Sequence, residues 1–217
     1  MMRKSNVNFI QKLLSIGSAP LSQQPVAVNI PDFDSYGLLA DDLLGVLRRK
    51  NGFYAFESAL HVFPASSFEG EMTLSRWNSF GLWRHEYADL ADTKLFFAED
   101  AFGNQFCFHD GGIWSFDAET GGLETCGKTL EEWAERILED YQLLTGHPLL
   151  HQWHVRNGAL PNGQRLLPKV PFVLGGEYVL ENLRAIAAIS GMKTRGNLAR
   201  QIRDLPDGAQ VQFRIIE

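Results

Sequence analysis

A thiol and an imidazole lie two residues apart within residues 98–117, AEDAFGNQFCFHDGGIWSFD. On a β-strand Cys107 and His109 would share one face, where a thiol–imidazole pair can act as a nucleophile. Such a nucleophile also needs a lowered thiol pKa and a group that stabilises an oxyanion, and the sequence shows neither. We therefore interpret the pair as ordinary sheet residues, and keep a small cysteine-dependent hydrolase as an alternative.

The same stretch is rich in carboxylates, so a calcium site is a second chemistry to consider. An EF-hand loop alternates oxygen ligands, with glycine at the sixth position and glutamate at the twelfth. After Asp100 the third position is Phe102, and Gly103 comes at the fourth. We therefore predict a tight turn, in which Gly103 or Asn104 takes a positive φ, and no calcium site.

Three histidines, His147, His151 and His154, have spacings that bind zinc when the segment is helical. However, Pro148 lies inside the segment, Gly146 precedes it, and the His-Glu-x-x-His pattern is absent. The glycine-rich run at residues 174–177 lacks the further glycines and the Lys or Thr of a phosphate-binding loop. The sequence therefore predicts neither a metal site nor a cofactor.

The amino-acid composition argues against several classes of protein. The chain has 20 Lys and Arg against 26 Asp and Glu, and this formal charge of −6 argues against nucleic-acid binding. Two cysteines do not make a disulfide framework, and free thiols are typical of a reducing cytoplasm. No secretory signal and no apolar run of membrane-spanning length is visible. We expect a soluble, cytoplasmic protein that binds neither nucleic acid nor membrane.

Periodicity predicts the elements that position these residues. Apolar stripes predict helices at residues 5–16, 35–50 and 129–144, the last with a Thr129–Glu132 capping box. Short aromatic runs between them predict an antiparallel sheet. Residues 146–176 are interpreted as a linker and irregular segment, with a short strand as an open alternative, because they are rich in turn-forming residues. Helices at 178–190 and 194–204, separated by a Gly191 stop, and a strand at 211–216 complete the prediction.

The order of these elements resembles a known family, the SUKH superfamily of the Smi–Knr cell-wall-regulator type. Asn51-Gly52 follows a leucine-rich helix and opens NGFYAFESALHVFP. FFAEDAFGNQF matches the family's aromatic strand, acidic residue and glycine, and GGIWSFDAETG resembles its following strand and acidic turn. The resemblance covers roughly residues 30–145, between an N-terminal helix and loop at residues 1–29 and a C-terminal extension at 146–217.

This resemblance implies an α+β fold with an antiparallel sheet flanked by helices, and the helices and strand expected after residue 146 add a C-terminal α/β extension that the resemblance does not cover. It also implies a non-enzymatic, protein-binding role without catalytic residues, as in bacterial immunity proteins that neutralise polymorphic toxins or in signalling scaffolds. Acidic turns would then face a basic toxin surface, where opposite charge speeds association. An aromatic segment, RWNSFGLWRHEYADL, is interpreted as core with a partner-binding patch as the alternative. The predicted partner-binding residues are Glu99, Asp100, Asp110, Asp117, Glu119 and Trp83.

Overall fold

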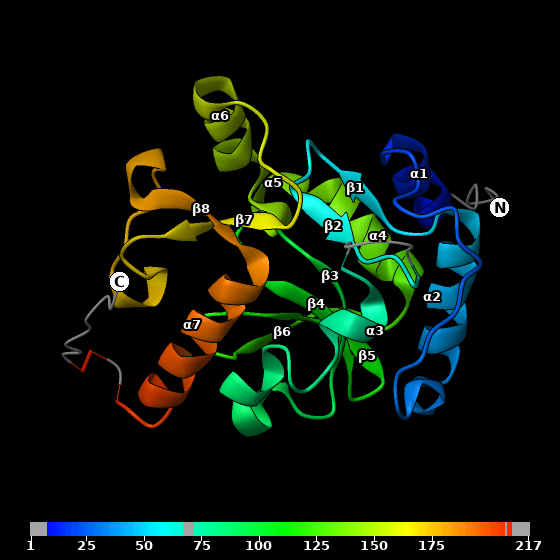
Figure 1. Ribbon diagram of the computed structural model, residues 1–217, viewed down its shortest axis with the longest axis horizontal. Helices are drawn as coiled ribbons and strands as arrows, with labels where there is room; N and C mark the ends of the chain where they lie inside the picture. The colour runs from blue at the N-terminus through cyan, green and yellow to red at the C-terminus, as the bar shows by residue number, and fades with distance from the viewer. Residues whose placement is uncertain (1–7, 67–71, 207, 210–217) are drawn as a thin grey trace, which may run out of the picture.

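The computed structural model describes residues 8–66, 72–206 and 208–209. Its centre is a six-stranded antiparallel sheet in which the strands follow one another in chain order (Figure 1). The strands are β1 Phe53–Ala55, β2 Leu60–Val62, β3 Leu95–Glu99, β4 Gln105–His109, β5 Gly112–Phe116 and β6 Leu123–Gly127. Helices and a second, two-stranded sheet surround it, which confirms the predicted α+β class.

Side chains along the central strands point alternately to the two faces of the sheet, and both faces are buried. On one face, Phe97, Phe106 and Phe108 pack against the helices α1 Phe9–Ile16, α2 Leu38–Arg49 and α4 Leu130–Glu139, with Trp133 in edge contact with Phe97 and Phe106. Thr129 caps α4 as predicted, because its hydroxyl accepts the N–H of Glu132. Burial of these rings is the main stabilising contribution on this side.

The opposite face is covered by the aromatic segment and by the chain's C-terminal part. The short helices α3 Leu74–Trp77, η2 Arg84–Glu86 and η3 Ala88–Ala91 bring Trp77, Trp83 and Tyr87 onto the sheet, all buried. Trp83 meets Phe96 and Tyr87 meets Phe116, both in edge contact. The interpretation of this segment as core therefore holds for these three side chains.

The C-terminal part is more regular than its composition suggests. It forms α5 Tyr141–Thr145, α6 His147–Asn157, β7 Gln164–Pro168, η4 Phe172–Leu174, η5 Leu180–Asn182, β8 Leu183–Ala187 and α7 Ala188–Ile202. The prediction of a linker at 146–176 is therefore wrong. Pro148 lies in the first turn of α6, where a helix loses no hydrogen bond to proline.

Two further predictions from sequence patterns are wrong, because contacts between residues far apart in the chain decide the structure there. The expected helix at 178–190 contains strand β8, because Arg165 and its neighbours on β7 pair with Ile186 and its neighbours. Gly191 does not end a helix but lies inside α7. A Cβ at this position would come within 2.7 Å of the Leu167 side chain. Glycine thus lets α7 approach β7 closely.

Other predicted ends shift or fall outside the described residues. The helix expected to run to 144 ends at Glu139, and α5 follows after Asp140. α1 begins after Asn8, whose side chain accepts the N–H of Gln11. Residues 5–7 of the first predicted helix and the strand at 211–216 lie outside the described residues. Within the described part, no helix has the length and apolar character needed to cross a membrane.

Candidate partner-binding site

A pocket of about 250 Å³ opens between the central sheet and the C-terminal part. The β3–β4 turn, the β5–β6 turn, the loop of residues 170–179 and α7 all contribute to it. Its walls are Phe102, Asn104, Asp117, Glu119, Phe172, Val173, Tyr178 and Arg195.

The rim of this pocket carries exposed apolar and aromatic side chains. Tyr178 stacks on Phe172 with ring centroids 3.8 Å apart and planes 5° apart, yet 64% of its surface is exposed. Val170, Val173 and Val179 in the same loop are also exposed. Exposed aromatic side chains grouped with aliphatic ones are typical of binding surfaces, and tyrosine is frequent among their energetic hot spots.

The loop that carries this rim is held in place by one amide side chain. Asn182 accepts the N–H of Val170 at 2.9 Å and donates to the carbonyls of Val170 and Glu177, both at 3.0 Å. A Cβ at Gly176 would lie 2.0 Å from the Val170 carbonyl oxygen, so only glycine closes this loop. The aromatic pair is therefore presented in a fixed conformation, which reduces the entropy lost on binding.

Glu119 supplies the pocket's acidic group. Only 4% of the residue is exposed, and its Oε2 accepts the backbone N–H of Val173 at 2.8 Å. Its Oε1 has no hydrogen-bond partner among the described residues. Burial raises the pKa of Glu119, since the ionised form loses hydration.

Arg195 closes the same pocket, and its charge acts to lower the pKa of Glu119 although the described residues show no ion pair between the two side chains. Its guanidinium donates to the carbonyl oxygens of Phe102 at 2.6 Å and Gly103 at 3.3 Å. The side chain is 5% exposed and fixes α7 to the β3–β4 turn. Its donors are thus directed to backbone carbonyls.

The six predicted partner-binding residues do not form one surface. Asp117 and Glu119 line the pocket, whereas Asp110 is exposed in the β4–β5 turn, at the opposite end of β4 from the pocket. Glu99, Asp100 and Trp83 are buried, at 2%, 5% and 0% exposure. As these residues lie in the structure, none of the three presents a surface to a partner: the carboxylates of Glu99 and Asp100 have internal partners, and Trp83 packs in the core, as the core interpretation of its segment expects.

Glu99 is paired with one cation, Arg165, and with the imidazole of His61, from different parts of the chain. Arg165 Nη2 lies 2.8 Å from its Oε1, and His61 Nδ1 lies 3.0 Å from the same oxygen. Burial acts to raise the pKa of Glu99, but Arg165 and His61 together outweigh it and hold that pKa below its ordinary value. Arg165 belongs to β7, so the C-terminal part covers and neutralises this carboxylate.

Asp100 is used inside its own turn. Its Oδ1 accepts the N–H groups of Phe102 and Asn104, both at 2.8 Å, and its Oδ2 accepts the Asn104 amide at 2.9 Å. Gly103 takes the predicted positive φ, 78°. The N–H of Leu166 on β7 then donates to the Ala101 carbonyl at 2.9 Å, which seals the turn from solvent.

A second pocket, of about 270 Å³, lies beside the Glu99 ion pair. Tyr54, Phe63 and Trp77 form part of its wall, together with His61 and Glu99. The Trp77 indole donates to Gln105 at 2.8 Å. The Glu99 carboxylate in this wall is already paired with Arg165 and His61, so it offers a bound molecule less than the Glu119 carboxylate does.

Cys107 and His109 do not form a nucleophilic pair in this structure. Cys107 is fully buried, and burial raises the pKa of its thiol to about 12. The His109 ring instead makes a polar contact with Thr93 Oγ1, at 3.5 Å from its Nδ1. Cys107 therefore lacks the accessible thiolate that nucleophilic catalysis needs.

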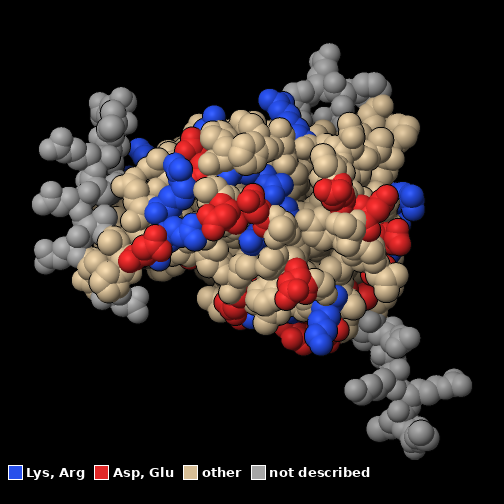
Figure 2. All heavy atoms as spheres, turned by 90° about the horizontal axis from the view of Figure 1, so that it is seen from below, with Lys and Arg blue, Asp and Glu red and all other residues tan. Residues whose placement is uncertain are grey.

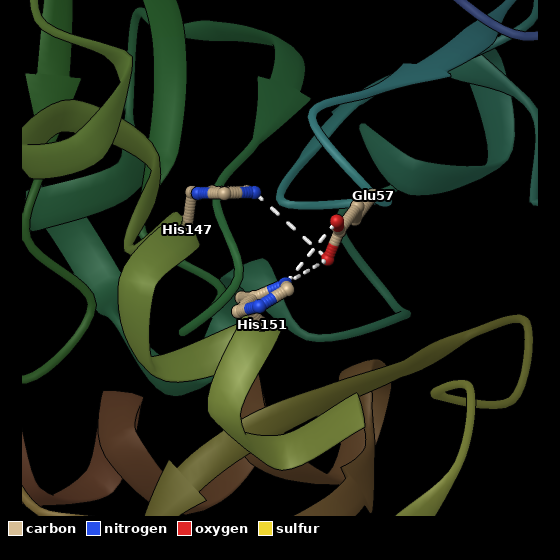
Figure 3. Close-up of side chains that lie close together, drawn as sticks. All are labelled: Glu57, His147 and His151. Atoms are coloured by element: carbon tan, nitrogen blue, oxygen red, sulfur yellow. Dashed lines mark hydrogen bonds and ion pairs between the residues drawn. The ribbon is translucent and has the colours of Figure 1, made fainter. Parts of the chain in front are cut away.

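The histidines of residues 147–154 do come together, contrary to the interpretation of that segment as irregular. His147 and His151 lie on α6 and point toward Glu57 in the turn between β1 and β2 (Figure 3). Sequence analysis missed Glu57, because it lies 94 residues before His151 and no motif links the two. Among the described residues, these three side chains have ligand atoms that lie close enough together to hold a metal ion.

The net charge of −6 does not produce a uniformly acidic surface on the face seen from below in Figure 2. Figure 2 shows acidic and basic side chains interspersed there, without a continuous field of one sign. Electrostatic recognition on this face would depend on local groups rather than on a uniformly acidic surface.

Comparisons with known proteins identify a similar fold but do not identify an activity. No protein-family model matches the chain, and no curated protein sequence does. The solved structure of Atu4351 from Agrobacterium tumefaciens is similar, with a TM-score of 0.54 and 16% sequence identity. The match covers 85% of this chain and 86% of that one. At this identity the similarity establishes a shared fold that includes most of the C-terminal part.

Proposed function

We propose that this protein is a non-enzymatic binding module of the immunity-protein type, which neutralises a toxin domain by binding it at the Glu119 pocket. The observation that carries the proposal is the exposed Tyr178–Phe172 stack beside a buried carboxylate with an unpartnered oxygen. The SUKH-like order of elements in residues 30–145 supports the same class of function. A signalling scaffold of this fold is the alternative.

The pocket suggests what the partner presents. An Arg or Lys side chain entering between Tyr178 and Val173 would place a donor near Glu119 Oε1 and lay its aliphatic stem on the aromatic rim. Asp117, exposed at the pocket edge, adds a second negative charge. A basic partner would also associate faster with a chain of formal charge −6.

The test measures binding of the toxin-like protein encoded beside this chain's gene. Tyr178→Ala removes the exposed ring, and we expect binding to weaken by about 2 kcal/mol, roughly thirtyfold, as for a typical hot spot. Glu119→Gln is expected to weaken it through faster dissociation. Phe80→Ala is the matched control, because Phe80 is 66% exposed but lies away from the pocket. Calorimetry or biolayer interferometry gives the affinities.

Each result decides a different part of the proposal. If no neighbouring toxin-like protein binds, the immunity role is rejected. If Tyr178→Ala and Phe80→Ala bind as tightly as the parent chain, the toxin binds elsewhere and the proposed surface is wrong. Co-expression separates immunity from scaffolding, since only an immunity protein restores the growth of cells that produce the toxin.

A further inference from the structure

We propose that Glu57, His147 and His151 form a binding site for zinc or a similar divalent transition metal, located where the β1–β2 turn meets α6 (Figure 3). The site lies apart from the Glu119 pocket, because the two share no lining residue. It is also independent of the proposed toxin binding.

The three side chains are already close to the spacing that a metal requires. His151 Nδ1 lies 2.9 Å and His147 Nε2 lies 3.9 Å from the same oxygen, Glu57 Oε2. All three ligand atoms lie within 4.8 Å of one another. Tetrahedral zinc with bonds of about 2.0–2.1 Å separates its ligand atoms by roughly 3.3 Å, so small side-chain rotations bring these atoms into place.

A third histidine lies beside the carboxylate without being a ligand. His154 Nε2 accepts the backbone N–H of Leu160 at 3.1 Å, so the neutral ring carries its proton on Nδ1. That Nδ1 lies 3.8 Å from Glu57 Oε2, which is beyond hydrogen-bond distance.

Aromatic contacts fix both sides of the site. Phe56, next to Glu57, stacks on Tyr141 with centroids 4.6 Å apart, and Tyr141 contacts the His147 ring edge-on at 5.1 Å. Phe56, Glu57 and Ser58 all have positive φ, a conformation that non-glycine residues rarely adopt. The turn therefore projects the Glu57 side chain toward α6.

The ligand types define the metal class. Two imidazoles and one carboxylate suit zinc and neighbouring transition metals, whereas calcium and magnesium prefer sites made entirely of oxygen ligands. Glu57 and His151 are exposed, so the fourth position of a tetrahedral ion would face solvent. Water or a group from another molecule would complete the coordination there.

The experiment uses the full chain without a histidine tag. Competition with a chromophoric zinc chelator at pH 7.5 measures affinity, and native mass spectrometry measures stoichiometry. We expect one zinc ion per chain, with Glu57→Gln and His151→Ala each weakening binding at least tenfold.

His85→Ala is the matched control, because His85 and Glu86 form a histidine–carboxylate pair with a 3.3 Å contact but have no second histidine. This variant should bind zinc like the parent chain. Circular dichroism of each variant without metal checks that the fold is retained. Absence of stoichiometric zinc binding, or equal binding by His151→Ala and the parent chain, would overturn the proposal.

Discussion

Asp100 shows how an acidic residue that resembles a surface group can belong to the interior. Its carboxylate accepts three N–H donors from its own turn, which favour the ionised form. Burial outweighs them and raises its pKa from 3.8 to about 7. The folded protein therefore holds the Asp100 proton more tightly than the unfolded chain does.

This shift predicts how stability depends on pH. Below about pH 4 Asp100 is protonated in both states, and as pH rises toward 7 the unfolded chain loses its proton first. Asp100 therefore contributes a loss of stability between pH 4 and 7, of about 4 kcal/mol at most for a shift of roughly three pKa units.

Asp100→Asn tests that contribution, because asparagine imitates the uncharged form. Urea unfolding of the parent chain at several pH values should show stability falling over this window, and the variant should show a smaller fall. Some slope remains in the variant, since burial also raises the pKa of Glu119. Identical slopes would show that Asp100 is ionised in the folded protein throughout the window.

At the scale of elements, the two-stranded sheet is fastened to the central sheet by buried arginines. Arg165 from β7 pairs with Glu99 on β3, and Arg195 from α7 binds the carbonyls of the β3–β4 turn. Removing one partner of a buried pair leaves an uncompensated charge, which is far more harmful than loss of an exposed pair.

We expect Arg165→Met to lower the free energy of unfolding by about 3–5 kcal/mol, because it leaves Glu99 buried beside neutral His61. The double variant Arg165→Met with Glu99→Gln should lose less than the sum of the two single changes. Arg156→Ala is the control, since its 2.8 Å pair with Glu181 is exposed and should contribute little to stability. Urea denaturation measures all four, and a similar loss in Arg156→Ala would contradict the role of burial.

At the scale of the whole molecule, the C-terminal part completes the core rather than extending it. A second apolar cluster joins Ala59, Ala101 and Phe102 of the central sheet to Leu150 of α6 and Leu166 of β7. These contacts cover the turn that holds Asp100 and the carboxylate of Glu99.

A chain that ends at Thr145 should therefore not fold cooperatively, although it contains all six strands of the central sheet. Truncation exposes Phe102 and leaves Glu99 without Arg165, and either change alone is destabilising. Near-ultraviolet circular dichroism and thermal unfolding check this prediction. Fixed aromatic signals together with a sharp transition in the truncated chain would show that residues 30–145 fold independently.

The sequence by itself determined the α+β class, the antiparallel strands and the capped helix α4. These follow from local patterns: alternating aromatic residues in residues 95–116, and the Thr129 cap within one turn of its partner Glu132. Side-chain periodicity and capping act over a few residues, so a sequence displays them directly.

Only the tertiary structure decided which acidic residues are exposed and which side chains form sites. Glu99 is buried because Arg165 reaches it from another sheet, and Glu57 meets His151 across 94 residues of chain. Strand β8 likewise depends on pairing with β7, which overrides the local preference for a helix. Charge pairing, strand pairing and ligand geometry depend on distances in space, and local sequence patterns do not specify those distances.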